Sequence, residues 1–237
     1  MNKKLWIIAN DDGLPGVKKD ILNIKDFFKS PFGGNWYESE IDEYVNYDKE
    51  LIINRKRVLK AKHLDYLVIY FSGHGGWQRE TNLTVNPKSE KIGESELLYI
   101  SEKQLNIFDC CRCYSETKMS MDSLVYKIAE RFGNTREKYE ERIAQANDQQ
   151  VTLYACKIGE FAHDQEIGAV YTTNLLKAAR ELNGEEYKLV SLAHDEASNL
   201  MDDFNRGKPT KDQQHPDHSY IKFNPNEQLI ISVNPYR

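Results

Sequence analysis

The stretch Asp65–Gly76, with the sequence DYLVIYFSGHGG, decides which fold the rest of the chain suggests. Its first part, Asp65–Phe71, is an apolar run of strand length, typical of a strand covered on both faces of a parallel sheet. The run ends in Ser72-Gly73-His74-Gly75-Gly76, whose glycines let the backbone turn sharply and leave an imidazole exposed. The pattern therefore places a titratable group at the carboxyl end of a strand, where α/β proteins form their sites.

Further runs of the same kind recur along the chain with amphipathic stretches between them. The predicted strands are Lys4–Ala9, Leu105–Cys110, Val151–Cys156 and Gln228–Val233, with Ile41–Val45 as a weaker candidate. Apolar residues at helical spacing predict helices over 17–28, 171–182 and 193–204, the last with Ser191 as its N-cap. The span 123–146 has the same spacing but is strongly charged. This alternation predicts one α/β domain, with a mostly parallel sheet of about six strands and helices on both faces.

Composition limits the classes of function. The 237 residues are 40% hydrophobic, enough for a sizeable core, and no linker or repeat divides them, so we expect a single domain over residues 1–237. The net charge of −5 gives no bulk reason to expect nucleic acid or an anionic membrane as a partner. The apolar runs fall far short of the roughly 20 residues of a membrane span, and no secretory leader is visible. We therefore expect a cytoplasmic protein.

A second strand end carries thiols. Leu105–Cys110 runs into Cys111-Arg112-Cys113, so that three of the four cysteines lie within four positions, and the fourth is Cys156. Without a secretory leader the default state is the reduced thiol, which leaves a nucleophile, a metal site or buried packing. A thiol beside His74 would have its proton acceptor at hand. A zinc site built from the three clustered cysteines and a histidine is the weaker alternative, because adjacent residues make awkward ligands.

Taken in order, these motifs resemble those of the caspase-like cysteine proteases (clan CD). They are more similar to the metacaspases and other prokaryotic caspase-like enzymes than to the animal caspases. DYLVIYFSGHGG resembles the family's His-bearing strand and loop, and LNIFDCCRCYS, residues 105–115, its Cys-bearing strand. Residues 151–179 resemble the strand and helix that open the smaller catalytic part. The Cys motif keeps the central Cys-Arg of the animal caspase signature Q-A-C-[RQG]-G and departs from it at the flanks. The resemblance implies a caspase-like fold.

The resemblance also implies the catalytic residues. Cys111 would be the nucleophile and His74 the general base and acid, with the backbone N–H groups of Gly75 and Cys111 forming an oxyanion hole. Cys110 is the competing nucleophile, and we expect it to face the core. No cofactor or metal is required by this chemistry. Some metacaspases need calcium, so calcium is a candidate activator, with no ligands that can be assigned in the sequence.

A substrate pocket follows from the same resemblance. Asp109 occupies the position of a pocket glutamine in animal caspases, and Asp20 and Ser72 match two other pocket positions of the metacaspases. Two carboxylates would attract Arg or Lys and repel Asp at the cleaved position. The alternatives are that Asp20 only complements a helix dipole, that Asp109 only accepts hydrogen bonds at a strand end, and that Ser72 is only a turn residue.

Family members often cut themselves between their two parts. Here residues 1–115 would form the larger part, 151–237 the smaller part, and 116–150 a cleavable linker rich in Lys and Arg. The expected partners are protein or peptide substrates and an activating protein or upstream protease. Relatives of this size act in bacterial cell-death or defence systems. The rival hypothesis is a catalytically silent caspase-like module that binds partners, against which the intact Cys–His pair argues.

Overall fold

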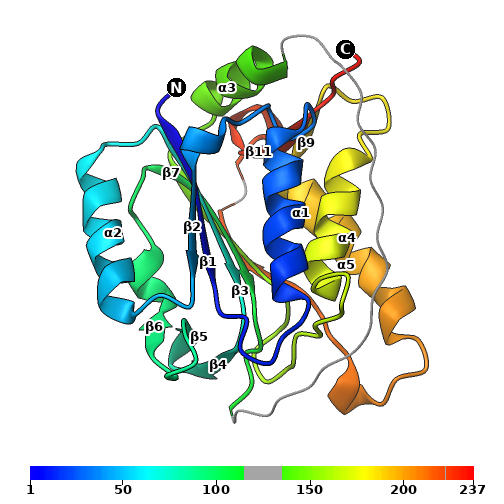
Figure 1. The fold of residues 1–237 in the computed structure, drawn as a ribbon. Coiled ribbons are helices and arrows are strands. Elements are labelled where there is room, and N and C mark those ends of the chain that lie inside the picture. Colours follow the sequence, from blue (N-terminus) through cyan, green and yellow to red (C-terminus); the bar gives the residue numbers. More distant parts are fainter. Residues whose placement is uncertain (115–134, 222) are drawn as a thin grey trace.

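The computed structural model describes residues 1–114, 135–221 and 223–237 (Figure 1). Within these residues, six strands form a central sheet in the order β10-β8-β7-β3-β1-β2. Five of them run parallel, and the edge strand β10 runs antiparallel to β8. The strands are β1 (Lys3–Ala9), β2 (Ile41–Val45), β3 (Tyr66–Ser72), β7 (Lys103–Asp109), β8 (Gln149–Tyr154) and β10 (Asp217–Ser219). The predicted α/β class with a mostly parallel sheet is confirmed.

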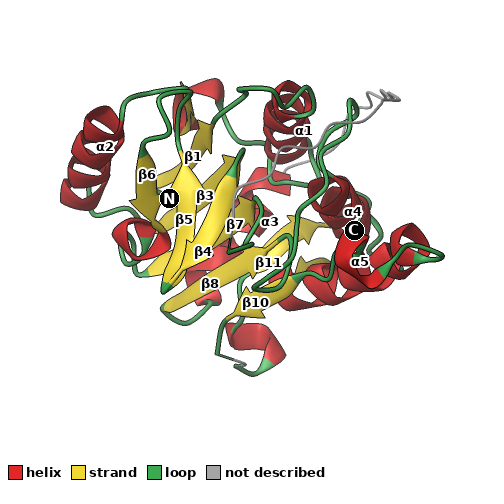
Figure 2. Cartoon of the chain, turned by 90° about the horizontal axis from the view of Figure 1, so that it is seen from below, coloured by secondary structure: helices red, strands yellow, loops and turns green. Residues whose placement is uncertain are grey.

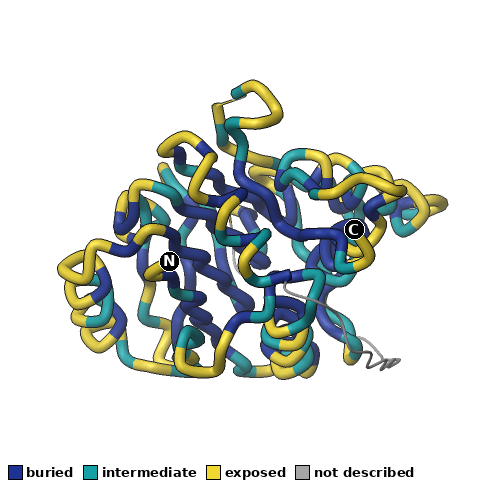
Figure 3. The backbone as a smooth tube through the Cα atoms, turned by 90° about the horizontal axis from the view of Figure 1, so that it is seen from above, coloured by how far each residue is buried: buried dark blue, intermediate teal, exposed yellow. Residues whose placement is uncertain are grey.

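Helices cover both faces of this sheet (Figure 1). On one face lie α1 (Val17–Lys29), α4 (Val170–Arg180) and α5 (Val190–Asn205), and on the other lies α2 (Lys49–Ala61). The fifth helix of the described residues, α3 (Thr135–Gln145), packs against β11 (Ile230–Val233). Because side chains alternate along a strand, Leu5 and Ile7 of β1 join the apolar cluster under α1, whereas Trp6 and Ile8 join the cluster under α2. Figure 3 shows buried backbone through the middle of the molecule and exposed stretches mainly around its outside.

One predicted strand was misplaced. Gln228–Val233 was expected in the central sheet, but β11 pairs with β9 (Tyr187–Leu189) in a separate two-stranded sheet. Its apolar residues are buried by contacts with α3, α4 and α5 instead. The sixth central strand is β10, which lies in a polar segment that the hydrophobic pattern assigns to a loop. An edge strand pairs on one side only, so a short polar stretch is sufficient there.

Other elements carried too weak an apolar pattern to be predicted. A small sheet of β4 (Gly75–Gln78), β5 (Glu80–Thr84) and β6 (Lys91–Gly93) follows His74 and lies beside the carboxyl ends of the central strands (Figure 2). Short 3₁₀ helices are found at Glu38–Glu40, Glu94–Leu97, Thr210–Asp212 and Pro225–Glu227.

The predicted N-cap of α5 was wrong. The helix begins at Val190 with Leu189 as its N-cap, and the Ser191 hydroxyl donates to Gln228 Oε1 at 2.8 Å. Of the charged span 123–146, the residues before Thr135 lie outside the described part, and α3 covers most of the remainder. Among the described residues, no helix combines the length and apolar character needed to cross a membrane.

Substitution of Ile107 in β7 tests how much the packing of this central strand contributes to the stability of the fold. Its side chain is 0% exposed, so Ile107→Ala is expected to lower the free energy of unfolding by about 2–5 kcal/mol, through lost burial and the cavity left behind. Leu51→Ala, at a side chain of α2 that is 49% exposed, should change it by less than about 0.5 kcal/mol. Urea denaturation followed by circular dichroism measures both values. Equal effects of the two substitutions would contradict this account of the core.

Candidate active site

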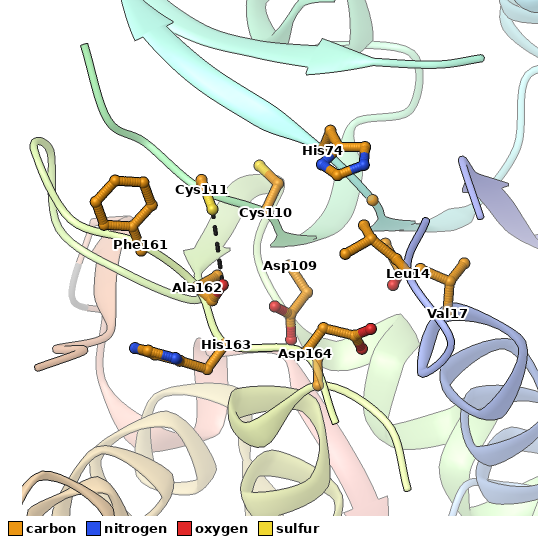
Figure 4. A pocket seen from close by; sticks show the side chains of 13 residues that line it. Leu14, Val17, His74, Asp109, Cys110, Cys111, Phe161, Ala162, His163 and Asp164 are labelled. Carbon is orange, nitrogen blue, oxygen red and sulfur yellow. Dashed lines mark hydrogen bonds between the residues drawn. The ribbon is translucent and has the colours of Figure 1, made fainter. Parts of the chain in front are cut away.

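The pairing of β3 with β7 brings the two predicted motifs together. The strands are parallel neighbours in register, with Ser72 opposite Asp109. Just beyond this pair the Gly73 N–H donates to the Asp109 carbonyl oxygen at 3.2 Å, so the two chains leave the sheet side by side. His74 and Cys111 therefore line the same pocket, which the segment 161–164 covers from the end of β8 (Figure 4).

Gly75 fixes how closely the two loops approach. A Cβ atom at this position would lie 2.6 Å from Cys110 Sγ and 2.8 Å from the Cys111 carbonyl oxygen, distances that no real side chain tolerates. The residue is therefore restricted to glycine by packing. This contact sets Gly75 and Cys111, the residues expected to supply the oxyanion-hole N–H groups, next to each other.

The His74 ring is oriented by the backbone. Its Nε2 lies 2.7 Å from the carbonyl oxygen of Asp12, in the loop after β1. A carbonyl oxygen can only accept, so Nε2 carries the proton, and Nδ1 of the neutral ring holds the lone pair that can take a proton. Sequence reasoning missed Asp12, because a main-chain carbonyl leaves no signal in residue type.

Cys111 is partly exposed, and its thiol is engaged away from the imidazole. Its Sγ donates to the Ala162 carbonyl oxygen at 3.6 Å, and Figure 4 shows the sulfur directed toward Ala162 and not toward the His74 ring. A hydrogen bond with the Cys113 side chain, together with burial, raises the thiol pKa well above its usual range. In this state the expected nucleophile is a protonated thiol.

The other cysteines differ from Cys111 in burial. Cys110 is 2% exposed and packs into the apolar cluster under α2, and burial raises its pKa. The Cys156 thiol donates to the carbonyl oxygens of Cys110 and Glu160, at 3.5 and 3.4 Å. The side chains that the structure describes contain no group of three His, Cys, Asp or Glu residues arranged to hold a metal ion, so the zinc alternative finds no ligand set there.

The three residues expected in the substrate pocket form one buried polar group. Asp20, in the first turn of α1, accepts from the Ser72 hydroxyl at 2.7 Å and from the Ala169 N–H at 2.8 Å. Asp109 accepts from the N–H and hydroxyl of Thr172, at 3.0 and 2.6 Å. Ser72 and Asp109 line the pocket, whereas Asp20 is fully buried behind them.

Burial dominates the protonation of these carboxyl groups. It raises the pKa of Asp109 to about 7. The pKa of Asp20 is also raised well above its usual range, first by burial and then by repulsion from Asp109. Two nearby carboxyls removed from water resist being ionised together, and a cation entering the pocket would relieve both costs.

Asp164 is a third carboxyl at the pocket. Its Oδ2 accepts from the Gly16 N–H at 3.0 Å, which ties the segment after β8 to the loop that precedes α1. Burial raises its pKa too. The sequence contains it only as one of several scattered acids, because nothing local predicts that these two loops meet.

Two histidines have partners that the sequence pattern does not indicate: a surface or loop position was expected for both, and His163 does lie in a loop, whereas His194 is buried in a helix. His194 of α5 is 2% exposed; its Nδ1 lies 2.8 Å from the Tyr171 hydroxyl, and burial lowers its pKa to about 4. His163 lines the pocket, with its N–H donating to Gln214 Oε1 at 3.0 Å and its Nε2 lying 2.9 Å from the Asp212 carbonyl oxygen. Their partners lie 23 to 51 positions away, so no local pattern marks them.

Arg112 anchors the segment that carries Cys111. Its guanidinium is 3.1 Å from Thr81 Oγ1 and 2.9 Å from Asp217 Oδ2, and it stacks 3.8 Å from the Tyr154 ring centre. Its own N–H and carbonyl group pair with Glu160 and Gly159, at 3.1 and 2.8 Å. With a further bond from the guanidinium to the Cys156 carbonyl oxygen at 3.2 Å, these contacts hold the backbone between Cys111 and Cys113 in place.

Comparison with solved structures shows the same fold. The chain is similar to caspase-1 from Spodoptera frugiperda, with a TM-score of 0.61 and 14% sequence identity over 92% of this chain and 86% of that one. It is also similar to a protein from Geobacter sulfurreducens, with a TM-score of 0.58 and 12% identity over 100% of this chain and 98% of that one. A search of curated proteins found no match.

The family model described as the caspase domain matches residues 3–220, a span that contains both motif-bearing strands and the segment that covers the pocket. The chain therefore belongs to the caspase domain family of cysteine peptidases.

Proposed function

We propose that the protein is a cysteine endopeptidase that uses Cys111 and His74 and cleaves protein or peptide substrates after Arg or Lys. One observation carries the proposal: His74 and Cys111, from adjacent strand ends, line one pocket whose wall includes the Asp109 carboxyl. Proximity of a thiol, a base and an anionic pocket is the minimum that this reaction needs.

The reaction begins when the Cys111 thiol turns from the Ala162 carbonyl oxygen to Nδ1 of His74, which takes its proton. The thiolate attacks the substrate carbonyl carbon, and the N–H groups of Gly75 and Cys111 stabilise the oxyanion. The Nδ1–H then protonates the leaving amine. Water, activated by the same nitrogen, hydrolyses the thioester and releases the acid product.

The preference for a cation follows from the buried acids. Arg or Lys at the cleaved position would neutralise the negative charge of Asp109. A neutralised Asp109 would also repel the Asp20 carboxyl less strongly. A substrate Asp would add a further carboxylate to the same pocket, at a cost of several kcal/mol.

Control of the enzyme belongs to the same proposal. The contact of the Cys111 thiol with Ala162 describes a resting state that an activator, an upstream protease or calcium would release. Self-cleavage would fall before Thr135, outside the described residues, because the later arginines Arg136 and Arg142 lie in α3 and Arg142 is only 6% exposed. A cytoplasmic role in bacterial cell death or defence is an analogy with the family.

The assignment of the nucleophile is tested by substituting neighbouring cysteines. Cys111→Ala and His74→Ala should each lower kcat on Arg-containing fluorogenic peptides by more than about 10⁴-fold, because they remove the nucleophile and its base. Cys110→Ala is the matched control and should keep kcat/KM within about threefold, since its thiol is buried under α2. Activity retained by Cys111→Ala would overturn the assignment.

The charge of the pocket predicts a pH dependence of binding. Because burial raises the pKa of Asp109 to about 7, its neutral form dominates below that pH, and affinity for a cation should fall as the pH drops from 8 to 6. Isothermal titration of the Cys111→Ala variant with a peptide ending in Arg measures this without catalysis. Asp109→Asn in that background should bind about 10- to 150-fold more weakly and lose the dependence.

Two further peptides test whether the charge of the substrate residue causes the pH dependence of binding. A peptide ending in citrulline, which has the shape of Arg without its charge, should bind weakly at every pH. Tighter binding of a peptide ending in Asp would contradict the acidic pocket and leave the peptidase assignment intact.

The hydrogen bond from the Gly16 N–H to Asp164 is expected to limit the access of reagents to Cys111 in the pocket. Asp164→Ala removes the acceptor and should raise the rate of alkylation of Cys111 by iodoacetamide about two- to tenfold, the equivalent of one hydrogen bond. Asp164→Asn keeps an acceptor oxygen and should stay near the wild-type rate. Peptide mass spectrometry assigns the label to Cys111, and unchanged labelling in Asp164→Ala would show that this contact does not hold the segment closed.

A further inference from the structure

Two aromatic side chains lie just beyond His74 and Cys111 along the chain. Trp77 of β4 and Tyr114 contact each other edge to face, with ring centres 5.6 Å apart and planes at 78°. Trp77 is partly exposed, and Tyr114 is 73% exposed. Two rings that touch each other and still reach solvent offer a surface on which a further apolar side chain can pack.

Backbone contacts hold both rings against the segment that follows β7. The Trp77 N–H donates to the Cys113 carbonyl oxygen at 2.9 Å. Side chains two positions apart on a strand share a face, so Trp77 projects from the face of β4 on which Gly75 packs against the same segment. A Cβ atom built at Gly159 would lie 3.5 Å from the Tyr114 ring, an ordinary contact distance, so the loop after β8 lies against this ring.

The neighbouring strand holds this surface in place. Thr81 of β5 pairs with Trp77 in the small sheet and is 0% exposed. Its hydroxyl lies 3.1 Å from Nε of Arg112, whose guanidinium also binds Asp217. The strand that carries one ring and the segment that carries the other are therefore tied together by buried polar contacts. Such a surface exists before a ligand arrives, which lowers the entropic cost of binding.

The two segments that carry the rings follow the same order. In residues 72–77 and in residues 109–114, the pocket residue comes first, the proposed catalytic residue lies two positions later, and the aromatic residue lies three further positions on. Contacts at the start, the middle and the end of the two segments keep them side by side. Three residues of extended chain span at most about 10 Å, a distance that two substrate residues and a large side chain can cover.

We propose that Trp77 and Tyr114 form a subsite for a large apolar side chain, best an aromatic one, in the first two residues after the cleaved bond. The inference rests on the proposed function and extends it to the leaving side of the substrate. With Arg in the acidic pocket and the scissile carbonyl at Cys111, the leaving segment runs toward the rings. Burial of its apolar side chain and edge-to-face contact with the rings then stabilise the bound peptide.

Cleavage of matched peptides measures this preference. Internally quenched peptides with Arg at the cleaved position carry Phe-Gly, Gly-Phe or Gly-Gly after it. The better of the two Phe peptides should have a kcat/KM about 3- to 30-fold above that of the Gly-Gly peptide, the effect of one partly buried aromatic contact. In Trp77→Ala and in Tyr114→Ala this ratio should fall to within about twofold of one, because half of the surface is gone.

Two further variants distinguish a subsite from a general effect on folding. Trp77→Phe keeps an aromatic ring and should retain most of the preference. Tyr99→Ala removes another exposed aromatic side chain, but one that precedes β7 and so lies at the opposite end of this strand, and should leave the ratio unchanged. Equal cleavage of the Phe and Gly-Gly peptides by the wild type, or a preference that survives in both alanine variants, would rule out the subsite.

A binding measurement keeps this inference separate from the proposed function. Of the three tryptophans, Trp6 and Trp36 are buried, so Trp77 is the one that a bound peptide can cover. In the Cys111→Ala variant, the better Phe peptide should shift tryptophan emission to shorter wavelength and bind about 3- to 30-fold more tightly than the Gly-Gly peptide. Added Trp77→Phe should abolish the shift.

The two readouts together assign any failure. A protein that shows the emission shift and the tighter binding but cleaves no peptide would refute the proposed function and leave the subsite standing. A protein that cleaves all three peptides alike, with no shift, would refute the subsite and leave the peptidase standing.

Discussion

The parallel pairing of β3 with β7 is the constraint on which the site depends. The register that sets Ser72 opposite Asp109 decides which residues leave the sheet together. A slip of one residue would turn every β7 side chain to the other face, sending the Asp109 carboxyl toward α2 and breaking its bonds to Thr172. Both strands are almost wholly buried, so such a slip would also place polar groups in the apolar clusters. The apolar core therefore specifies the relative position of the segments that carry His74 and Cys111.

Main-chain carbonyl groups contact the side chains of both His74 and Cys111. The Asp12 carbonyl fixes the proton on Nε2 of His74, and the Ala162 carbonyl accepts from the Cys111 thiol. The first contact leaves Nδ1 of the His74 ring as the proton acceptor, and the second directs the Cys111 thiol away from that ring. Segments from three strand ends, after β1, β3 and β8, thus converge on the thiol that follows β7.

Much of this arrangement could be predicted from sequence, for a physical reason. The buried strands β1, β3, β7 and β8 each contain an apolar run because helices cover both faces, and the bounds of β2 agree with those predicted. Prediction failed where one-sided burial weakens the pattern, as in β10, or where an apolar run finds partners outside the main sheet, as in β11. The contacts of Asp12, His163 and Asp164 depend on loops that meet only after folding, so no local pattern records them.

The burial of Asp20 beside Asp109 has a consequence for how the protein can change over time. Folding raises the pKa of both carboxyls, so near neutral pH they ionise more readily in the unfolded chain than in the folded protein. At that pH they therefore lower the stability of the folded state. Selection for heat resistance alone would favour neutral amides at these positions, whereas selection for recognition of cations would retain the acids. Laboratory evolution under those two pressures should therefore diverge first at these two residues.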